Sequence, residues 1–325
     1  MSTRWETNRF EPADVEAVVA LWQRVFPDYY LSVATLRKYT FDCPDWAVFD
    51  PDGCWVARDD DRIVGFGMAK ERDVTEGTIP VIFVDPAHRM QGIGRDLLER
   101  AETYLRDKGK DKILIGARPS EPCTILAFPS VCANWMDAHW FFWHFGYRVR
   151  DSLDSARCPL ESFAIPPKVQ RQIESAAAEG IVAGPGRAED ELAMMAFMKE
   201  WFAEDGSGWY ERFAQGAAGR KESVDQGERV YEDFTVLRQG ERVIGLIGRA
   251  FFLPSGETMI GGAIGVAGDI RGRGLGNVVL YTFLQMLKDR GARECMIWGV
   301  GPRRYYEPAG FRMSELWLMM EKNLR

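Results

Sequence analysis

Residues 271–276 read RGRGLG and combine two arginines with three glycines. An apolar run, MIGGAIGV, lies upstream, and NVVLYTFLQMLKDRG, with apolar residues at helical spacing, lies downstream. A glycine turn at the start of a helix exposes backbone N–H groups and the positive end of the helix dipole to an anion. Arg271 and Arg273 add donors that suit phosphate oxygens. The turn therefore predicts a pyrophosphate site.

Two other glycine-rich phosphate motifs do not fit this turn. A Walker A loop needs G-K-[ST], and a dinucleotide fingerprint needs G-x-G-x-x-G with an acidic residue about twenty positions later. Neither pattern is present at 271–276. The alternative is that the glycines only allow close packing at this turn. A second turn of the same kind in the chain makes that alternative less favoured.

The chain contains such a second copy, because its two halves repeat each other. RIVGFGMAKE at 62–71 matches RVIGLIGRAF at 242–251, and each is followed by a glycine turn and a helical pattern. The candidate anion-binding residues of the first turn are Arg89, Gln91, Gly92 and Gly94. Those of the second turn are Arg271, Gly272, Arg273, Gly274, Leu275 and Gly276.

The repeat predicts two tandem domains, 1–165 and 166–325, separated where prolines and glycines interrupt a polar stretch. Each copy opens with an amphipathic helix and continues with strands, the glycine turn, a second helix and a further strand. In the second copy, Gln239 and Gly240 signal a hairpin turn, and Gly291 is a plausible end of the second helix. This order predicts an α+β fold in which each domain has a mixed, mostly antiparallel sheet flanked by helices.

Composition limits the classes of partner. The formal net charge of −7 argues against general binding to nucleic acid or anionic membranes. No signal-peptide pattern follows Met1 and no apolar run approaches the roughly 20 residues of a membrane span, so we expect a cytoplasmic protein. The six cysteines include no CxxC pair, which indicates free thiols. The three histidines have no metal-site spacing, so we expect no metal.

The R-x-x-G-x-G turn between strand and helix, together with YYEPAGF at 305–311, resembles the GCN5-related N-acetyltransferase (GNAT) family. The resemblance covers both halves of the chain. It implies that backbone amides of the turn bind the pyrophosphate of acetyl-CoA, the cosubstrate. It also implies that the pantetheine arm inserts between two parallel strands that splay apart. These are the strand that includes Ile264 and Val266 and the strand that contains MIWGV.

The family's usual general acid is a tyrosine four residues before the glycine of a terminal GF, and it protonates the departing thiolate. This position is Tyr306 in the second copy and Phe142 in the first. A phenol with a pKa near 10 has a proton to give, whereas a phenyl ring has none. We therefore expect the second domain to be catalytic and the first to be non-catalytic. We also expect Tyr305 to tolerate loss of its hydroxyl better than Tyr306.

The general base is left open by the sequence. The family often places a glutamate on the strand before the turn, but IGGAIGV carries no carboxylate. The remaining candidates, each of which more simply fits a solvated surface charge, are Glu200, Glu204, Glu257 and Glu307. The segment KEWFAEDGSGWYERF at 199–213 offers aromatic faces and carboxylates that suit a cationic amine. Packing in an interdomain core explains its aromatic residues equally well.

Two hypotheses follow. In the first, the second domain transfers an acetyl group from acetyl-CoA to a primary amine of a small molecule by direct attack. In the second, the chain is an acyl-CoA-binding sensor or regulatory module that acetylates no amine, which would account for Phe142 and for the missing strand glutamate. The acceptor, the acyl length and the oligomeric state are left open at this point.

Overall fold

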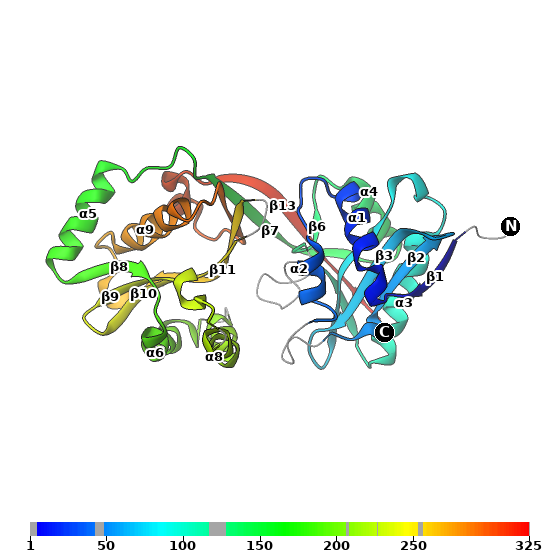
Figure 1. The fold of residues 1–325 in the computed structure, drawn as a ribbon, viewed down its shortest axis with the longest axis horizontal. Helices are drawn as coiled ribbons and strands as arrows, with labels where there is room; N and C mark the ends of the chain where they lie inside the picture. Colours follow the sequence, from blue (N-terminus) through cyan, green and yellow to red (C-terminus); the bar gives the residue numbers. More distant parts are fainter. Residues whose placement is uncertain are drawn as a thin grey trace. The chain divides into compact units, whose positions relative to one another are not determined.

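The structure is a computed structural model that describes residues 5–42, 49–116, 128–205, 208–225, 227–252 and 256–324. The chain forms two compact units (Figure 1). Unit 1 comprises residues 1–154 and 315–325, and unit 2 comprises residues 155–314.

Unit 1 contains the elements of the first sequence copy. Its amphipathic helix buries Val15, Val18, Leu21 and Trp22 at the spacing of one helix face. The elements are β1 (Trp5–Arg9), α1 (Val15–Val25), α2 (Val33–Lys38), β2 (Cys54–Asp59), β3 (Arg62–Glu71), β4 (Glu76–Val84), α3 (Ile93–Asp107), β5 (Lys112–Ile115), β6 (Val131–Cys132), α4 (Met136–His144) and β7 (Arg148–Pro159).

Unit 2 repeats this order and adds helices. The predicted hairpin turn is confirmed, because Gln239 pairs with Arg242 across an antiparallel ladder and Gly240 has a φ of +60°. The elements are α5 (Pro167–Ala178), β8 (Ile181–Pro185), α6 (Glu191–Phe202), α7 (Trp209–Gln215), α8 (Ala217–Asp225), β9 (Thr235–Gln239), β10 (Arg242–Phe252), β11 (Glu257–Val266), α9 (Leu275–Asp289), β12 (Glu294–Trp298), α10 (Arg303–Tyr306) and β13 (Arg312–Asn323).

The strands of each unit form a mixed sheet with the same order. In unit 1 the order is β1-β2-β3-β4-β5, and in unit 2 it is β8-β9-β10-β11-β12. Neighbours in both sequences are antiparallel except β4 with β5 and β11 with β12, which pair in parallel. The predicted α+β fold with a mixed, mostly antiparallel sheet is therefore confirmed.

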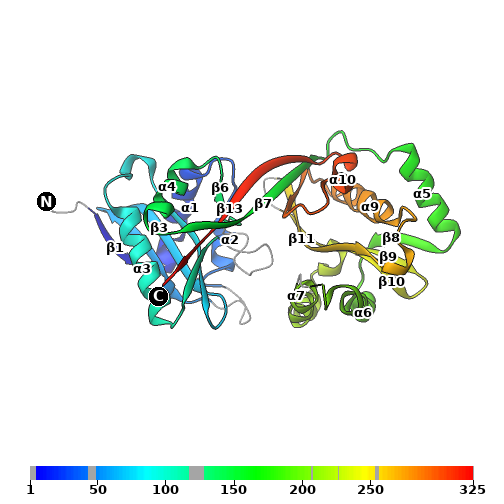
Figure 2. The ribbon, with the colours of Figure 1, turned by 180° about the vertical axis from the view of Figure 1, so that it is seen from behind.

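Helices cover both faces of the unit 2 sheet. Figure 1 shows α5 and α9 on one face and α6 and α8 on the other, and Figure 2 shows α7 beside α6. The apolar face predicted for α9 is fully buried and consists of Val279, Phe283, Leu284 and Leu287. The helix ends at Asp289, and Gly291 follows with a φ of +85°, the left-handed conformation common just past a helix C-terminus.

Each sheet is extended by a strand segment from the other half of the sequence. The end of β13 pairs with β5, where Glu321 lies opposite Leu114. The end of β7 pairs with β12, where Cys158 lies opposite Cys295. The expected division at residue 165 follows the sequence repeat, whereas the compact units begin and end elsewhere. Local sequence does not reveal this exchange, because an alternating strand can pair with any compatible edge.

The described cysteines are free and buried, namely Cys54, Cys132, Cys158 and Cys295. Cys43 and Cys123 lie outside the described residues. Within the ranges that the structure describes, no helix has both the length and the apolar character needed to cross a membrane.

Candidate active site

The chain enters both glycine turns in the same conformation. In unit 2 a 3₁₀ turn, Gly268–Ile270, leads from β11 to Arg271, which has a φ of −61° and a ψ of 160°. In unit 1 the 3₁₀ turn Pro86–His88 leads to Arg89, which has a φ of −66° and a ψ of 161°. The repeat seen in the sequence therefore extends to the backbone of the turns.

The glycines occupy the left-handed region in which side chains are disfavoured. Gly274 precedes α9 with a φ of +78°, and Gly92 precedes α3 with a φ of +93°. Two positions earlier, Gly272 has a φ of +83°, and its unit 1 counterpart is a non-glycine residue, Met90, with a φ of +61°. Glycine adopts this conformation without strain, and at Gly274 a Cβ would also come within 2.4 Å of the Gln172 side chain.

The start of α9 can bind an anion through its backbone. No side chain caps the amides of the first turn of α9 or of α3. The first turn of α3 carries Asp96, whereas the first turn of α9 carries no acidic residue. Because a carboxylate near a helix N-terminus repels an anion, the unit 2 turn is electrostatically better suited to an anion than the unit 1 turn.

The two arginines of the unit 2 turn already have protein partners. The Nε of Arg271 donates to the carbonyl of Val266 at 3.3 Å, and its guanidinium lies 5.9 Å from the centre of the Trp201 ring. Arg273 forms an ion pair with Glu179, which follows α5. No local sequence pattern indicates that α5 meets the turn.

The strands β11 and β12 part before the turn, as the family resemblance implied. Their parallel pairing ends at Ile260 and Ile297. A register shift in the β10–β11 pairing, beside Gly262 with its φ of +141°, marks a bulge that bends β11. Ile264 and Val266 lie past the last pair, where strand-edge groups can bind the amides of a ligand. Whether they bind pantetheine stays a prediction.

Tyr306 is the last residue of α10 and is 5% exposed. Its ring contacts those of Tyr305, with centres 4.9 Å apart, and Phe311, with centres 5.6 Å apart. Among the described residues, its hydroxyl has no hydrogen-bond partner. Burial, reinforced by the nearby Cys295 thiol, raises the pKa of Tyr306 well above its ordinary value. The phenol is therefore held in its protonated form.

Tyr305 links α10 to the glycine turn. Its hydroxyl donates to the carbonyl of Gly276 at 2.6 Å. A Cβ on Gly276 would come within 3.2 Å of the Tyr305 ring, so the glycine permits this approach. From the sequence, Tyr305 was expected only to tolerate loss of its hydroxyl better than Tyr306, and no sequence signal indicated this hydrogen bond.

Unit 1 keeps the ring packing of this site but lacks both hydroxyls. Phe142 is buried, and its ring centre lies 5.5 Å from that of Tyr147, an arrangement that matches Tyr306 against Phe311. Phe141 lies against Gly94 as Tyr305 lies against Gly276: a Cβ on Gly94 would be 3.4 Å from its ring. Unit 1 therefore has no phenol in the place of Tyr306.

The four candidate bases are spread over unit 2. Glu257 begins β11, at the end away from the turn, and pairs with Arg157 at 3.0 Å. Glu200 lies 4.0 Å from Arg242, and Glu204 and Glu307 are exposed. The position of Glu257 indicates a structural ion pair, so it is a poor candidate for the base.

The aromatic residues of 199–213 pack on the core of unit 2 itself. Trp201, Trp209 and Tyr210 are partly buried against that core. A Cβ on Gly268 would lie 2.5 Å from the Trp201 ring, which places this indole beside the turn. Its N–H is buried without an acceptor among the described residues. Residues 206 and 207 of this segment lie outside the described ranges.

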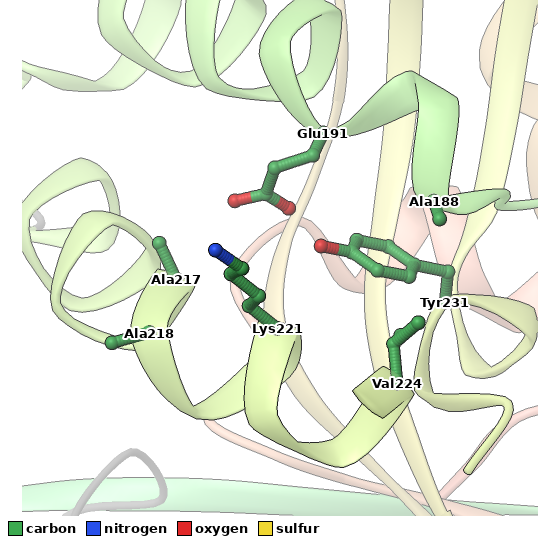
Figure 3. A pocket seen from close by; sticks show the side chains of 7 residues that line it. All are labelled: Ala188, Glu191, Ala217, Ala218, Lys221, Val224 and Tyr231. Carbon is green, nitrogen blue, oxygen red and sulfur yellow. The ribbon is translucent and has the colours of Figure 1, made fainter. Parts of the chain in front are cut away.

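A separate pocket of about 420 Å³ lies at the start of α6 (Figure 3). The Lys221 amine and the Glu191 carboxylate point into the same space, and Tyr231 lies beside them. Arg220 binds both carboxylate oxygens of Glu191, at 3.0 and 2.7 Å. Because no residue of the glycine turn, β11 or α10 lines this pocket, it is not part of the candidate active site.

In the described part of the chain, no cluster of three or more ligating side chains is placed to hold a metal ion.

Comparison with known proteins identifies the class. Residues 15–122 and 194–311 match the model of the acetyltransferase (GNAT) family, and the chain therefore belongs to this family. The two matched regions correspond to the two copies. The predicted tandem relationship to the family is thus confirmed.

Individual relatives agree with this assignment. A mycothiol acetyltransferase from Thermobispora bispora is 29% identical over 133 residues, which are 38% of this chain and 44% of that protein. The match thus spans less than half the length of this curated relative. A GCN5-related N-acetyltransferase from Sphaerobacter thermophilus has a TM-score of 0.70 at 19% identity, with 100% of this chain and 97% of that chain covered. A tandem GNAT protein from the clavulanic acid biosynthesis pathway has a TM-score of 0.66 at 17% identity and covers 98% of both chains.

Proposed function

We propose that this acetyltransferase moves the acetyl group of acetyl-CoA to a primary amine of a small molecule, and that unit 2 carries out the reaction. The observation that carries the proposal is the link between the anion-binding turn and the phenol. Tyr305 binds the carbonyl of Gly276, and the next residue is the buried Tyr306. Unit 1 has phenylalanine at both positions.

The turn would hold the cosubstrate by its pyrophosphate. The amides at the start of α9 donate to phosphate oxygens, and Arg271 and Arg273 add positive charge. The pantetheine arm would then follow the part of β11 that contains Ile264 and Val266, past its pairing with β12. We infer that this path would lead the thioester toward Tyr306.

The reaction is a direct acyl transfer. The neutral amine attacks the thioester carbon, the C–N bond forms, the C–S bond breaks, and the electron pair of that bond goes to sulfur. Tyr306 donates its proton to the sulfur, and the proton released by the attacking amine restores the phenol through solvent. Burial stabilises the phenol relative to the phenolate, so the proton moves as charge builds on sulfur rather than before.

The acceptor would approach from α6 and α7. Trp209 and Tyr210 lie on α7, which packs against β11, and Glu204 lies just after α6 with its side chain exposed. Aromatic faces beside a carboxylate favour a cationic amine before it loses its proton. The net charge of −7 supports a small cationic acceptor rather than nucleic acid or an anionic membrane. We also propose a cytoplasmic location, which the buried free cysteines support.

Unit 1 is proposed to bind acyl-CoA without turning it over. Its turn repeats the backbone of the unit 2 turn, which supports binding, and Phe142 supplies no proton. Replacing Gly92 by valine should abolish binding at this turn and leave the turnover number of the enzyme largely unchanged. Loss of activity in a folded variant that still binds CoA in unit 2 would show that the active unit is misassigned.

The deciding experiment is a thiol-release assay with acetyl-CoA and a panel of polyamines, aminoglycosides, amino acids and peptides. An amine that releases CoA stoichiometrically with its own acetylation supports the transferase. Saturable CoA binding with no release across the panel would support the sensor hypothesis instead.

A further inference from the structure

A second pocket, of about 290 Å³, adjoins the unit 2 turn. Helix α5 forms one wall, and the residues Arg273 and Leu275, on either side of Gly274, form the other. Gln172 fixes α5 in this place. Its side chain would meet a Cβ on Gly274 at 2.4 Å, and its amide oxygen accepts from the Asn277 side chain at 3.3 Å.

The pocket is basic. Lys168 and Arg171 of α5 line it together with Arg273. Glu179, which also lines it, is the partner of Arg273. Lys168 and Arg171 have no carboxylate partner among the described residues. The pocket therefore carries an excess of positive charge from two cations that can accept an anionic ligand.

Among the described residues of unit 1, an indole lies where unit 2 has α5. The indole of Trp5 occupies the space next to Gly92, where a Cβ would be 3.7 Å from the ring. Its N–H donates to the carbonyl of Gln91, the counterpart of Arg273, at 3.3 Å. An apolar ring thus stands beside the unit 1 turn, and a basic helix stands beside the unit 2 turn.

Acyl-CoA carries two anionic groups near this point. Its pyrophosphate is followed by a ribose whose 3′-hydroxyl bears a phosphate monoester, a dianion at neutral pH. With the pyrophosphate on the amides at the start of α9, the adjoining basic pocket matches the charge of that phosphate.

We propose that α5 and Arg273 form a binding pocket for the ribose 3′-phosphate of acyl-CoA. Unit 2 therefore discriminates acyl-CoA from its 3′-dephospho form, and unit 1 does not. The inference rests on the proposed function, because it takes the unit 2 turn as the pyrophosphate site. It assigns a role to α5, a helix outside both regions that match the family model.

The test is a two-by-two comparison of ligand and variant by calorimetry on the full chain. The ligands are CoA and 3′-dephospho-CoA, and the proteins have either the wild-type pocket or the double substitution Lys168→Gln/Arg171→Gln, both with Gly92→Val to remove binding by unit 1. We expect the wild-type pocket to bind CoA about tenfold more tightly than dephospho-CoA at unit 2, given two partly exposed charge contacts. The double variant should lose that preference and bind dephospho-CoA as the wild-type pocket does.

Dephospho-CoA is the internal control for folding, because a distorted turn would weaken both ligands alike. Lys221→Gln, in the separate pocket of Figure 3, is the matched charge control and should leave the preference intact. Equal affinity of the wild-type unit 2 site for the two ligands, or an equal loss of both in the double variant, would overturn the pocket assignment. If neither ligand binds to wild type, the proposed acetyl-CoA-dependent function itself fails.

Discussion

Replacing Tyr306 by phenylalanine separates catalysis from stability in this chain. The ring packs between Tyr305 and Phe311, and phenylalanine preserves that packing. The hydroxyl has no hydrogen-bond partner among the described residues, so its removal breaks no bond there. The free energy of unfolding should therefore change by less than about 0.5 kcal/mol. Loss of a positioned general acid should lower kcat by about 10²- to 10⁴-fold.

Tyr305→Phe is the matched control with the opposite expectation. It removes the 2.6 Å hydrogen bond to Gly276 and leaves a carbonyl short of one donor. The expected loss of stability is about 1 kcal/mol, with a higher KM for acetyl-CoA and a smaller loss in kcat. Although the two residues are adjacent, Tyr306→Phe should mainly lower kcat, whereas Tyr305→Phe should mainly lower stability and raise the KM for acetyl-CoA.

The assay measures kcat and KM by thiol release with the acceptor found in the panel, and stability by urea unfolding. Because burial raises the pKa of Tyr306, the wild-type kcat should show no fall from phenol ionisation at pH values up to the ordinary phenol pKa of about 10. A Tyr306→Phe enzyme with wild-type kcat across this pH range would refute the assignment of the acid. An equal stability loss in both variants would refute the reasoning about their hydroxyls.

Three further results are expected. Gly274→Val should lower CoA affinity at least tenfold, since a β-branched residue disfavours the φ of +78° and its Cβ would meet Gln172. Unchanged affinity in calorimetry would contradict the assignment of this turn to CoA binding. Burial opposes ionisation of Asp190, but the hydrogen bonds from the Arg238 side chain and the Arg187 backbone N–H, together with the charges of both arginines, lower its pKa below the ordinary 3.8. The ion pair of Asp190 stabilises the fold fully above the unfolded-state pKa, and this stabilisation is lost as the pH falls through the lower pKa of the folded state. Asp190→Asn should therefore flatten the fall in Tm below pH 4. An unchanged slope of Tm against pH would contradict this ion-pair assignment. A chain that ends at residue 314 lacks the fully buried Trp317, so the free energy of unfolding of unit 1 should fall by at least about 3 kcal/mol. An unaltered unfolding curve would contradict the assignment of the end of β13 to unit 1.

Much of the fold and part of the site could be predicted because their signals are local. A glycine that must adopt a left-handed φ, such as Gly274, is visible as a residue type at a fixed place in a repeat. The apolar face of α9 follows from helical periodicity, and the Tyr306 and Phe142 difference follows from counting back from a glycine.

The remaining features join residues that are distant in sequence. Tyr305 meets Gly276 across 29 positions, and Asn277 meets Gln172 across 105. No local pattern encodes such contacts, because they depend on how helices pack after the sheet has formed. The general base is a similar case: four carboxylates were equivalent in sequence, and only the fold showed Glu257 paired with Arg157.

The sequence by itself determined the duplication, the α+β order of elements, the two glycine turns and the difference between Tyr306 and Phe142. The tertiary structure decided which strands complete each sheet, that α5 supplies a basic wall beside the second turn, and that Tyr305 links α10 to that turn. The physical reason is that backbone propensity and hydrophobic period act over a few residues, whereas every strand edge presents the same hydrogen-bonding groups. The choice among partners is therefore made by the packing of the whole chain.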